Sequence, residues 1–301
     1  MTVEHPDLAV VPFHRITVTE AMRVAVQSVI ESGWWTTGPV AREFEDRFAR
    51  AVGAPHAVAV SSGTAALELA LCALDVGEGD SVITTPYTFA ATAEVVVRRG
   101  ARVRFADIEP DTLQLSVSAT RSRLLELRRA GERVRAIVVV HFGGAPADLG
   151  GFDALAREFE VAIVEDAAHA FPTRYAGTRI GTPRESAASP SLACFSFYAN
   201  KTLCTGEGGM LTTDDAGIAR RVRRLALHGI DRTPWDRGGR PYEVLEVGTK
   251  ANLPDLLACL GLVGLDLAEK ELSVRRRIAD RYHRAFRGLV DLELPAADDR
   301  S

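Results

Sequence analysis

Several features that define other protein classes are missing from this 301-residue sequence. Its 36 Lys and Arg are outnumbered by 40 Asp and Glu, and the formal net charge of -4 argues against nucleic-acid binding. No apolar run reaches the roughly 18 residues that a membrane-spanning helix needs. No signal peptide is visible, because the acidic residues Glu4 and Asp7 come early and no long apolar segment follows. We therefore expect a globular protein that binds neither nucleic acid nor membranes.

Cysteine is scarce, and two catalytic patterns are missing with it. The four cysteines are scattered, mostly in or beside apolar runs: Cys72, Cys194, Cys204 and Cys259. This favours reduced thiols and a cytoplasmic protein. No second histidine or cysteine lies at ligand spacing from His169, so we expect no metal site. A G-x-S-x-G motif before a helix is also missing, which argues against a Ser-His-Asp hydrolase.

What the sequence does contain is a regular alternation of apolar strands and helical patterns. Its 47% hydrophobic and 25% charged residues are ordinary for a globular protein. We expect strands at 57–60, 81–85, 102–106, 136–140, 161–164, 192–197 and 210–213. Near-continuous apolar strands separated by helices predict an α/β fold, a three-layer sandwich whose mostly parallel sheet is covered on both faces.

The expected helices set the division of the chain. They lie at 17–31, 40–52, 65–74, 90–99, 118–130, 149–159, 216–228 and 253–289, and residues 229–248 are expected to form a long loop. We expect a large α/β domain with its N-terminal segment at 1–230. Residues 231–301 would then be a loop and a long helix that lead into a smaller second domain. The run Arg275-Arg276-Arg277 in that helix is interpreted as a solvated face.

Three polar or aromatic residues fall at or shortly after expected strand ends: Phe89, Asp166 and Lys201. Ligands of parallel sheets bind at this edge, so the three residues are expected to converge. Partial desolvation there would lower the amine pKa of Lys201 toward its nucleophilic form, although a solvated loop lysine is the plainer alternative. Asp166 fits either a helix N-cap or a carboxylate that pairs with a buried cation. His169, taken alone, is a core histidine by default.

A short polar turn follows the strand expected at 57–60. Gly63 and Thr64 lie in this turn, and Thr64 occupies the position expected for a helix N-cap. A strand, a small-residue turn and a helix start also form a natural phosphate site, because free N–H groups and the helix dipole point to one place. Capping and phosphate binding explain these residues equally well.

One ligand would account for the whole set, and that ligand is pyridoxal 5'-phosphate. Lys201 could form a Schiff base with its aldehyde, and Asp166 could keep its ring nitrogen protonated. Phe89 could stack on the ring. The phosphate could be held by Gly63, Thr64 and Ser196. The protonated ring would be the electron sink for carbanion chemistry.

At these residues the sequence resembles the sugar-nucleotide aminotransferases of the DegT/DnrJ/StrS family. The resemblance runs from about Phe13 to Leu267. Its most specific segments are SGWWTTGP at 32–39, VSSGTAAL at 60–67, EDAAHA at 165–170, and FSF through Lys201 to GEGG at 195–209. The resemblance implies the fold type I architecture of pyridoxal-phosphate enzymes. Within the family, the chain resembles most the enzymes that make UDP-linked 4-amino-4-deoxy-arabinose.

The resemblance also implies a role for each site residue. Lys201 would hold the cofactor covalently and then carry the proton between substrate and cofactor. Asp166 would pair with the ring nitrogen, and His169 would stand near the ring hydroxyl. Asn252 matches an asparagine that reaches the phosphate of the neighbouring subunit, which implies a homodimer with shared active sites. Phe89 would stack on the ring, and Gly63, Thr64 and Ser196 would bind the phosphate.

The implied reaction is a transamination in polysaccharide or related sugar biosynthesis. Glutamate would donate its amino group to the cofactor, and a nucleotide-linked keto-sugar would accept it. A branch of the family carries histidine in place of the lysine and performs dehydration, so Lys201 favours amino transfer. Relatives run on beyond Ser301, and the second domain is expected to be incomplete. The alternatives are a non-catalytic or regulatory protein of this fold, or dehydration or aromatisation of a sugar-derived substrate.

Overall fold

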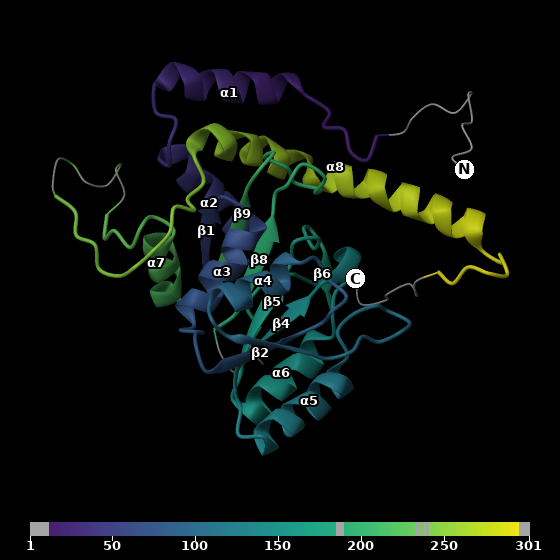
Figure 1. Cartoon of the computed structure of the whole chain (residues 1–301). Coiled ribbons are helices and arrows are strands. Elements are labelled where there is room, and N and C mark those ends of the chain that lie inside the picture. Colours follow the sequence, from purple (N-terminus) through teal and green to yellow (C-terminus); the bar gives the residue numbers. More distant parts are fainter. Residues whose placement is uncertain (1–11, 185–189, 233–234, 236–237, 239–240, 295–301) are drawn as a thin grey trace, which may run out of the picture.

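A seven-stranded sheet forms the centre of the molecule (Figure 1). The structure is a computed structural model that describes residues 12–184, 190–232, 235, 238 and 241–294. The strands are β1 (His56–Val60), β2 (Asp80–Thr84), β3 (Arg102–Phe105), β4 (Arg133–Val140), β5 (Ala162–Asp166), β8 (Leu192–Ser196) and β9 (Gly209–Thr213). Their order is β1-β9-β8-β5-β4-β2-β3, and β9 runs antiparallel to both of its neighbours. The remaining pairs are parallel, which confirms the mostly parallel sheet.

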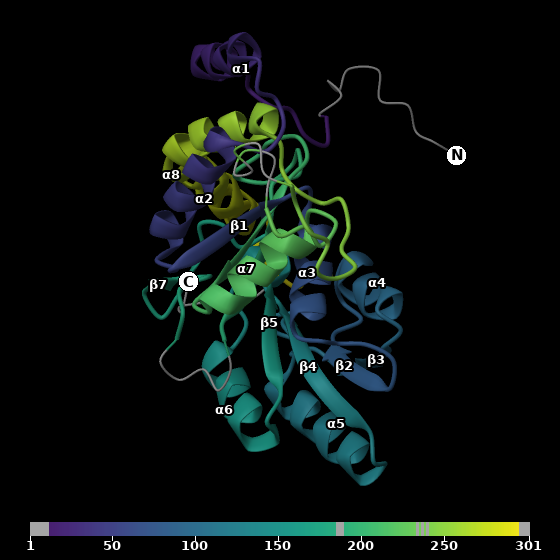
Figure 2. The ribbon, with the colours of Figure 1, turned by 90° about the vertical axis from the view of Figure 1, so that its left-hand side faces the viewer.

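Helices cover both faces of the sheet and complete the three layers (Figure 2). The helices are α1 (Glu20–Ser32), α2 (Pro39–Val52), α3 (Gly63–Ala73), α4 (Ala91–Arg98), α5 (Val117–Arg129), α6 (Leu149–Phe159), α7 (Ala216–Leu225) and α8 (Asp255–Phe286). One core packs α3, α4 and α7 onto the sheet, and the other packs α2, α5, α6 and the first part of α8 onto the opposite face. A short hairpin of β6 (Arg174–Tyr175) and β7 (Thr178–Arg179) lies outside the main sheet.

Strand β5 shows how the two cores divide its side chains. Ile163 packs in the core of α5 and α6, whereas Val164 packs in the core of α3 and α4. Since successive strand residues point to opposite faces, Glu165 lies on the first face and Asp166 on the second. The sequence predicted that this strand ends at residue 164. It continues through Asp166, because the backbone there still pairs with β4 and with Cys194 of β8.

The start of α3 corrects one expectation. The N-cap is Ser62, whose extended backbone lets its hydroxyl oxygen accept a hydrogen bond from Ala65 N at 3.0 Å. The helix therefore begins at Gly63, and the prediction that Thr64 is the N-cap is wrong. The physical reason is that Ser62 already satisfies the N–H three residues on. Thr64 stands in the first turn of the helix, where its hydroxyl has no capping role.

Helix α8 joins the end of the described chain to the large domain. Its first half is buried against α2, where Gly261 allows contact so close that an added Cβ would lie 2.5 Å from the Phe44 ring. The buried carboxylate of Asp255 caps α2 by accepting from Gly38 N at 2.7 Å and Ala41 N at 2.9 Å. The second half of α8 is exposed. Among the described residues, no helix is both long enough and apolar enough to span a membrane.

Candidate active site

The carboxyl edge of the sheet brings together residues from neighbouring strands. Asp166 ends β5, Ser196 ends β8, and these two strands pair through Asp166 and Cys194. Lys201 follows β8 in a tight turn, in which its N–H donates to the Tyr198 carbonyl at 2.9 Å. The negative charge of Asp166 acts on the Lys201 amine and raises its pKa, although burial lowers that pKa overall. Two of the three residues expected to converge, Asp166 and Lys201, therefore lie near each other at this edge.

The half-buried amine of Lys201 has a pKa below its ordinary value. Burial is the main cause, because desolvation disfavours the charged ammonium. The negative charge of Asp166 opposes the shift, and the positive charge of Arg275 adds to it. Arg275 also donates to the Asn200 carbonyl at 3.0 Å, so α8 reaches the residue next to Lys201. The three arginines at 275–277 are exposed, as expected, but the first of them also contacts the site.

Asp166 is held as a buried carboxylate. It is 6% exposed, and its Oδ2 accepts from the Thr92 hydroxyl at 2.7 Å while Oδ1 accepts from Ala168 N at 3.2 Å. The described residues 167–173 form turns, so the N-cap interpretation is wrong and the interpretation as a cation partner is favoured. Thr92, which lies in the first turn of α4, is not among the residues predicted from the sequence. Its proximity to Asp166 depends on the strand order, which the sequence does not reveal.

His169 lies in the turn that follows Asp166. It is exposed rather than part of the core, so its default interpretation as a core histidine is wrong. Its ring stands 6.5 Å from the Phe142 ring. Desolvation lowers the pKa of His169, the positive charge of Lys201 lowers it further, and the charge of Asp166 raises it. The two predicted charged residues therefore both influence His169, as expected for one shared site.

The small residues that were predicted to bind a phosphate pack closely together. A Cβ added to Gly63 would lie 2.9 Å from the Ser196 Cβ, so glycine is needed for this approach. Gly209 lies as close to Ser62, where an added Cβ would stand 2.4 Å from the carbonyl carbon. The first N–H groups of an α-helix have no intrahelical acceptor, so those of Gly63 and Thr64 stand at the positive end of α3 without one. The Ser196 hydroxyl adds a further donor.

Two predicted residues are arranged differently from the central cluster. Phe89 lies one turn before Thr92 and is 76% exposed, which leaves its ring free to stack. Asn252 bridges to Val60, on the far side of β9 from Ser196. Ordinary strand spacing puts it about 14 Å from Ser196. Its amide donates to the Thr37 hydroxyl at 2.5 Å, and Lys250 donates to its carbonyl. Within one chain the side chain of Asn252 therefore bonds to residues outside the cluster.

The cluster suits the groups of pyridoxal 5'-phosphate. The amine of Lys201 has a lowered pKa, which suits an aldehyde, and the buried Asp166 carboxylate suits a protonated ring nitrogen. The small-residue cradle at Gly63 and Ser196 suits a phosphate, since a larger residue at position 63 would collide with Ser196. These three parts come from separate elements of the fold, and they meet at one edge of the sheet.

Comparison with known proteins identifies similar chains. Residues 17–301 match the profile of the DegT/DnrJ/EryC1/StrS aminotransferase family. The chain is 43% identical over 278 residues to the spore coat polysaccharide biosynthesis protein SpsC of Bacillus subtilis, which covers 91% of this chain and 68% of SpsC. It is 39% identical over 274 residues to protein MJ1066 of Methanocaldococcus jannaschii, which covers 90% of this chain and 68% of that protein.

Solved structures show the same fold. The aminotransferase TlmJ from Streptoalloteichus hindustanus superposes with a TM-score of 0.86 at 33% identity, over 96% of this chain and 74% of TlmJ. Spr1654 from Streptococcus pneumoniae, assigned as a sugar aminotransferase and solved in its PLP form, gives a TM-score of 0.82 at 30% identity. That match covers 92% of this chain and 72% of Spr1654.

Proposed function

The chain belongs to the DegT/DnrJ/EryC1/StrS aminotransferase family, and on that basis we propose that it transfers an amino group from glutamate to a nucleotide-linked keto-sugar. Its cofactor is pyridoxal 5'-phosphate. The observation that carries the proposal is the convergence of Lys201, Asp166 and the Gly63–Ser196 cradle at one edge of the sheet. Amine, carboxylate and phosphate site together match a cofactor enzyme rather than a generic binding cleft.

Each residue has a distinct part in the proposal. When bound, the cofactor supplies an electron sink for negative charge on the substrate carbon. Lys201 would hold the aldehyde and, once released, would move a proton at the substrate carbon, which its lowered pKa favours. Asp166, oriented by Thr92, would hold the proton at the ring nitrogen. His169 would stand near the ring hydroxyl. Phe89 would stack on the ring, and Gly63, Thr64 and Ser196 would bind the phosphate.

The substrate class rests on the relatives and on the sequence motifs. SpsC is named for spore coat polysaccharide biosynthesis, and Spr1654 is assigned to the sugar aminotransferases. Their likeness to this chain, together with the motifs at 32–39 and 165–170, supports a keto-sugar as the amino acceptor. We propose that a nucleotide carries this sugar. The enzymes that make UDP-linked 4-amino-4-deoxy-arabinose are the members of the family that the chain resembles most, so the UDP-linked keto-sugar of that reaction is the first substrate to test.

The proposed enzyme is a homodimer. Within its own chain the Asn252 side chain bonds to Thr37 and Lys250 rather than to Ser196, and we assign it to the cofactor of the neighbouring subunit. An apolar groove of about 540 Å³ between α1 and the start of α8 supplies a surface for association. Its apolar lining residues include Ile16, Val18, Met22, Val26, Ile30 and Leu260, and the turn at 204–206 forms one wall. A two-fold axis would cover both copies of this groove.

Location and domain organisation complete the proposal. We place the enzyme in the cytoplasm, which the four free cysteines support because disulfides are rare there. We also propose that a large α/β domain ends at residue 230 and that a second, smaller domain follows it. The segment after it contains α8, whose exposed second half leads away from the sheet (Figure 1).

The test is an assay of amino transfer. The protein, loaded with pyridoxal 5'-phosphate, is incubated with glutamate and a panel of keto-sugar nucleotides, and the products are analysed by mass spectrometry. We expect an amino-sugar nucleotide together with 2-oxoglutarate, and neither from Lys201→Ala. A product that has lost water without gaining nitrogen would instead indicate dehydration. Cofactor binding without turnover of any member of the panel would support a non-catalytic protein.

A further inference from the structure

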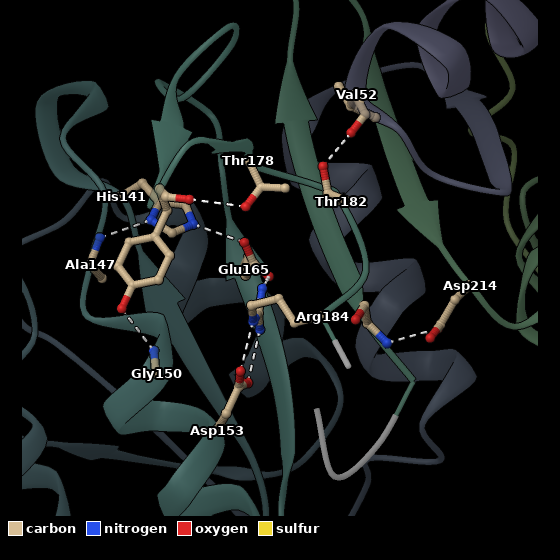
Figure 3. Close-up of polar contacts among 12 residues, drawn as sticks. Val52, His141, Ala147, Gly150, Asp153, Glu165, Thr178, Thr182, Arg184 and Asp214 are labelled. Carbon is tan, nitrogen blue, oxygen red and sulfur yellow. Dashed lines mark hydrogen bonds and ion pairs between the residues drawn. The ribbon is translucent and has the colours of Figure 1, made fainter. Parts of the chain in front are cut away.

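Directly behind Asp166, on the opposite face of β5, lies a buried charged network (Figure 3). His141 is fully buried, Glu165 and Asp153 are each 1% exposed, and Arg184 is mostly buried. Nothing in the proposed chemistry uses these four residues. Burying several ionisable groups is costly unless each is fully hydrogen-bonded, so their arrangement calls for an explanation.

Glu165 is the centre of this network. Its Oε2 accepts from His141 Nε2 at 3.1 Å, and its Oε1 accepts from Arg184 Nη1 at 2.5 Å. The remaining guanidinium nitrogens of Arg184 donate to Asp153 of α6 at 2.8 and 3.0 Å, which forms a bidentate pair. Burial alone would raise the pKa of Glu165, but Arg184 and His141 outweigh it, and the pKa lies below its ordinary value. Glu165 is therefore an anion whose two oxygens both face donors.

The orientation of His141 is fixed by its other ring nitrogen. Nδ1 accepts a hydrogen bond from Ala147 N at 3.1 Å, so it carries a lone pair and no proton. The ring proton is thereby assigned to Nε2, which donates it to Glu165. Exchanging the tautomer would place two protons between Nδ1 and Ala147 N. His141 can therefore only donate to position 165.

His141 also connects this network to Asp166. Its backbone N–H donates to the Asp166 carbonyl at 3.1 Å while its ring holds Glu165, so one residue holds the last two residues of β5. The same residue begins the turn Phe142–Gly144, and Gly144 lies so close to His169 that an added Cβ would stand 2.9 Å from its carbonyl oxygen. The network thus sets the strand end that carries Asp166 and supports the turn beside it.

We propose that Glu165, held by Arg184 and His141, is a positioning residue that fixes the Asp166 carboxylate against the ring nitrogen of the cofactor. The inference rests on the proposed role of Asp166. Glu165 does not touch the cofactor in this account, since its side chain lies on the other face of the sheet. It acts by fixing where β5 ends and how its last residue is turned.

Glu165→Gln tests the proposal with little change in volume. A glutamine presents one oxygen and one NH₂ group, but position 165 faces a donor on each side, so the NH₂ group would oppose either His141 or Arg184. The strand end must shift to relieve this conflict. The decisive readout compares the dissociation constants of pyridoxal 5'-phosphate and of its 1-deaza analogue, which lacks the ring nitrogen. A residue that acts through Asp166 affects the first ligand and spares the second.

We expect Glu165→Gln to weaken pyridoxal 5'-phosphate binding by about tenfold or more, the size expected for a disturbed hydrogen bond to a charged group. Binding of the 1-deaza analogue should change by less than about twofold. Asp166→Asn should show the same selective loss. Arg121→Met is the control, because it breaks an equally bidentate but exposed pair with Glu158 on α5 and α6, and it should leave both constants unchanged.

The outcomes separate the two claims. If Glu165→Gln weakens both ligands equally, or neither, the positioning role is overturned. If Asp166→Asn weakens both equally, or neither, the assignment of Asp166 itself fails. Should Glu165→Gln not fold, as judged by circular dichroism, Arg184→Lys replaces it. Lysine keeps the charge but loses the bidentate geometry, so the proposal expects the same selective loss at smaller size, and an unselective result would contradict it.

Discussion

At the carboxyl edge of the sheet, charged side chains from several elements share one site, whereas at the amino edge Arg133 and Glu132 each form a local ion pair. The amino edge has a hollow of about 920 Å³ at the starts of β4 and β5. Arg133 pairs there with Asp80 at 2.5 Å, and Arg104 pairs with Glu132 at 2.6 Å. At the other edge, Asp166 and Lys201 each shift the pKa of His169. The hollow at the amino edge therefore does not mark the candidate active site, which lies at the opposite edge of the sheet.

The direction of the helices explains this difference. The helices that cross between parallel strands begin at the carboxyl edge and end at the amino edge. The carboxyl edge thus receives the positive helix ends, such as the start of α3, which suit a phosphate. The amino edge receives the negative ends, and Arg128 and Arg157 stand in the last turns of α5 and α6. These arginines complement the helix dipoles at this edge.

The largest expected effect concerns the hydroxyl that orients Asp166. Thr92→Val removes the 2.7 Å hydrogen bond to Asp166 without a change in shape. A hydrogen bond to a charged group is worth about 1.5–3 kcal/mol, so pyridoxal 5'-phosphate should bind roughly 10- to 100-fold more weakly. Equilibrium dialysis measures the change. Thr120→Val is the matched control, because this buried hydroxyl has no hydrogen-bond partner within the described residues. Equal effects of the two substitutions would contradict the account.

A smaller effect is expected from the arginine that approaches Lys201. Its positive charge contributes to the lowered pKa of Lys201, so Arg275→Gln should raise that pKa. The measurement is the pH dependence of acylation of Lys201 in the cofactor-free protein, and its midpoint should move to higher pH. Arg277→Gln removes an exposed charge on the same helix and should leave the midpoint in place. A midpoint that moves down, or moves equally in both variants, would refute the electrostatic role of Arg275.

The smallest effect belongs to the amino edge. Hydrogen bonds from Arg104 and Ser81 lower the pKa of Glu132 from its ordinary value of 4.5 to about 2. A carboxyl with a depressed folded-state pKa stabilises the protein above its unfolded pKa, and this contribution is lost as the pH falls through the folded pKa. Wild type should therefore exceed Glu132→Gln in free energy of unfolding at neutral pH, and the difference should shrink from pH 4.5 toward pH 2. Urea unfolding measures it. Loss of amino transfer in the variant at neutral pH would contradict the statement that Glu132, at the amino edge, has no part in the reaction.

The positions of the candidate site residues that follow strands could be predicted from the sequence. Parallel strands place their carboxyl ends at one edge, so Asp166, Ser196 and Lys201 could be brought together without knowledge of the strand order. The small residues around Gly63 likewise indicated a phosphate site, although the N-cap was placed two residues too late. The alternation of apolar runs and helices was sufficient for the fold class.

Contacts between distant segments could not be predicted in this way. Thr92 meets Asp166 across 74 residues, and Arg275 meets Asn200 across 75. These pairs depend on which strands are neighbours and on the path of α8 over the sheet. The pairing of Glu165 with Arg184 could not be predicted either. A glutamate before Asp166 is expected to be solvent-exposed, and its burial becomes known only from the structure. The sequence around each of these residues, taken separately, does not indicate that they meet in the folded protein.

The central claim is that Lys201 is the residue that binds the cofactor, and the composition of the chain allows a direct test. The sequence contains only three lysines, Lys201, Lys250 and Lys270, and the last two are exposed in the structure. The protein is loaded with pyridoxal 5'-phosphate, reduced with borohydride and mapped by peptide mass spectrometry. The account predicts a pyridoxyl group on Lys201 at about one per chain, with little on the exposed lysines. A label on Lys250 or Lys270 in preference to Lys201 would contradict it.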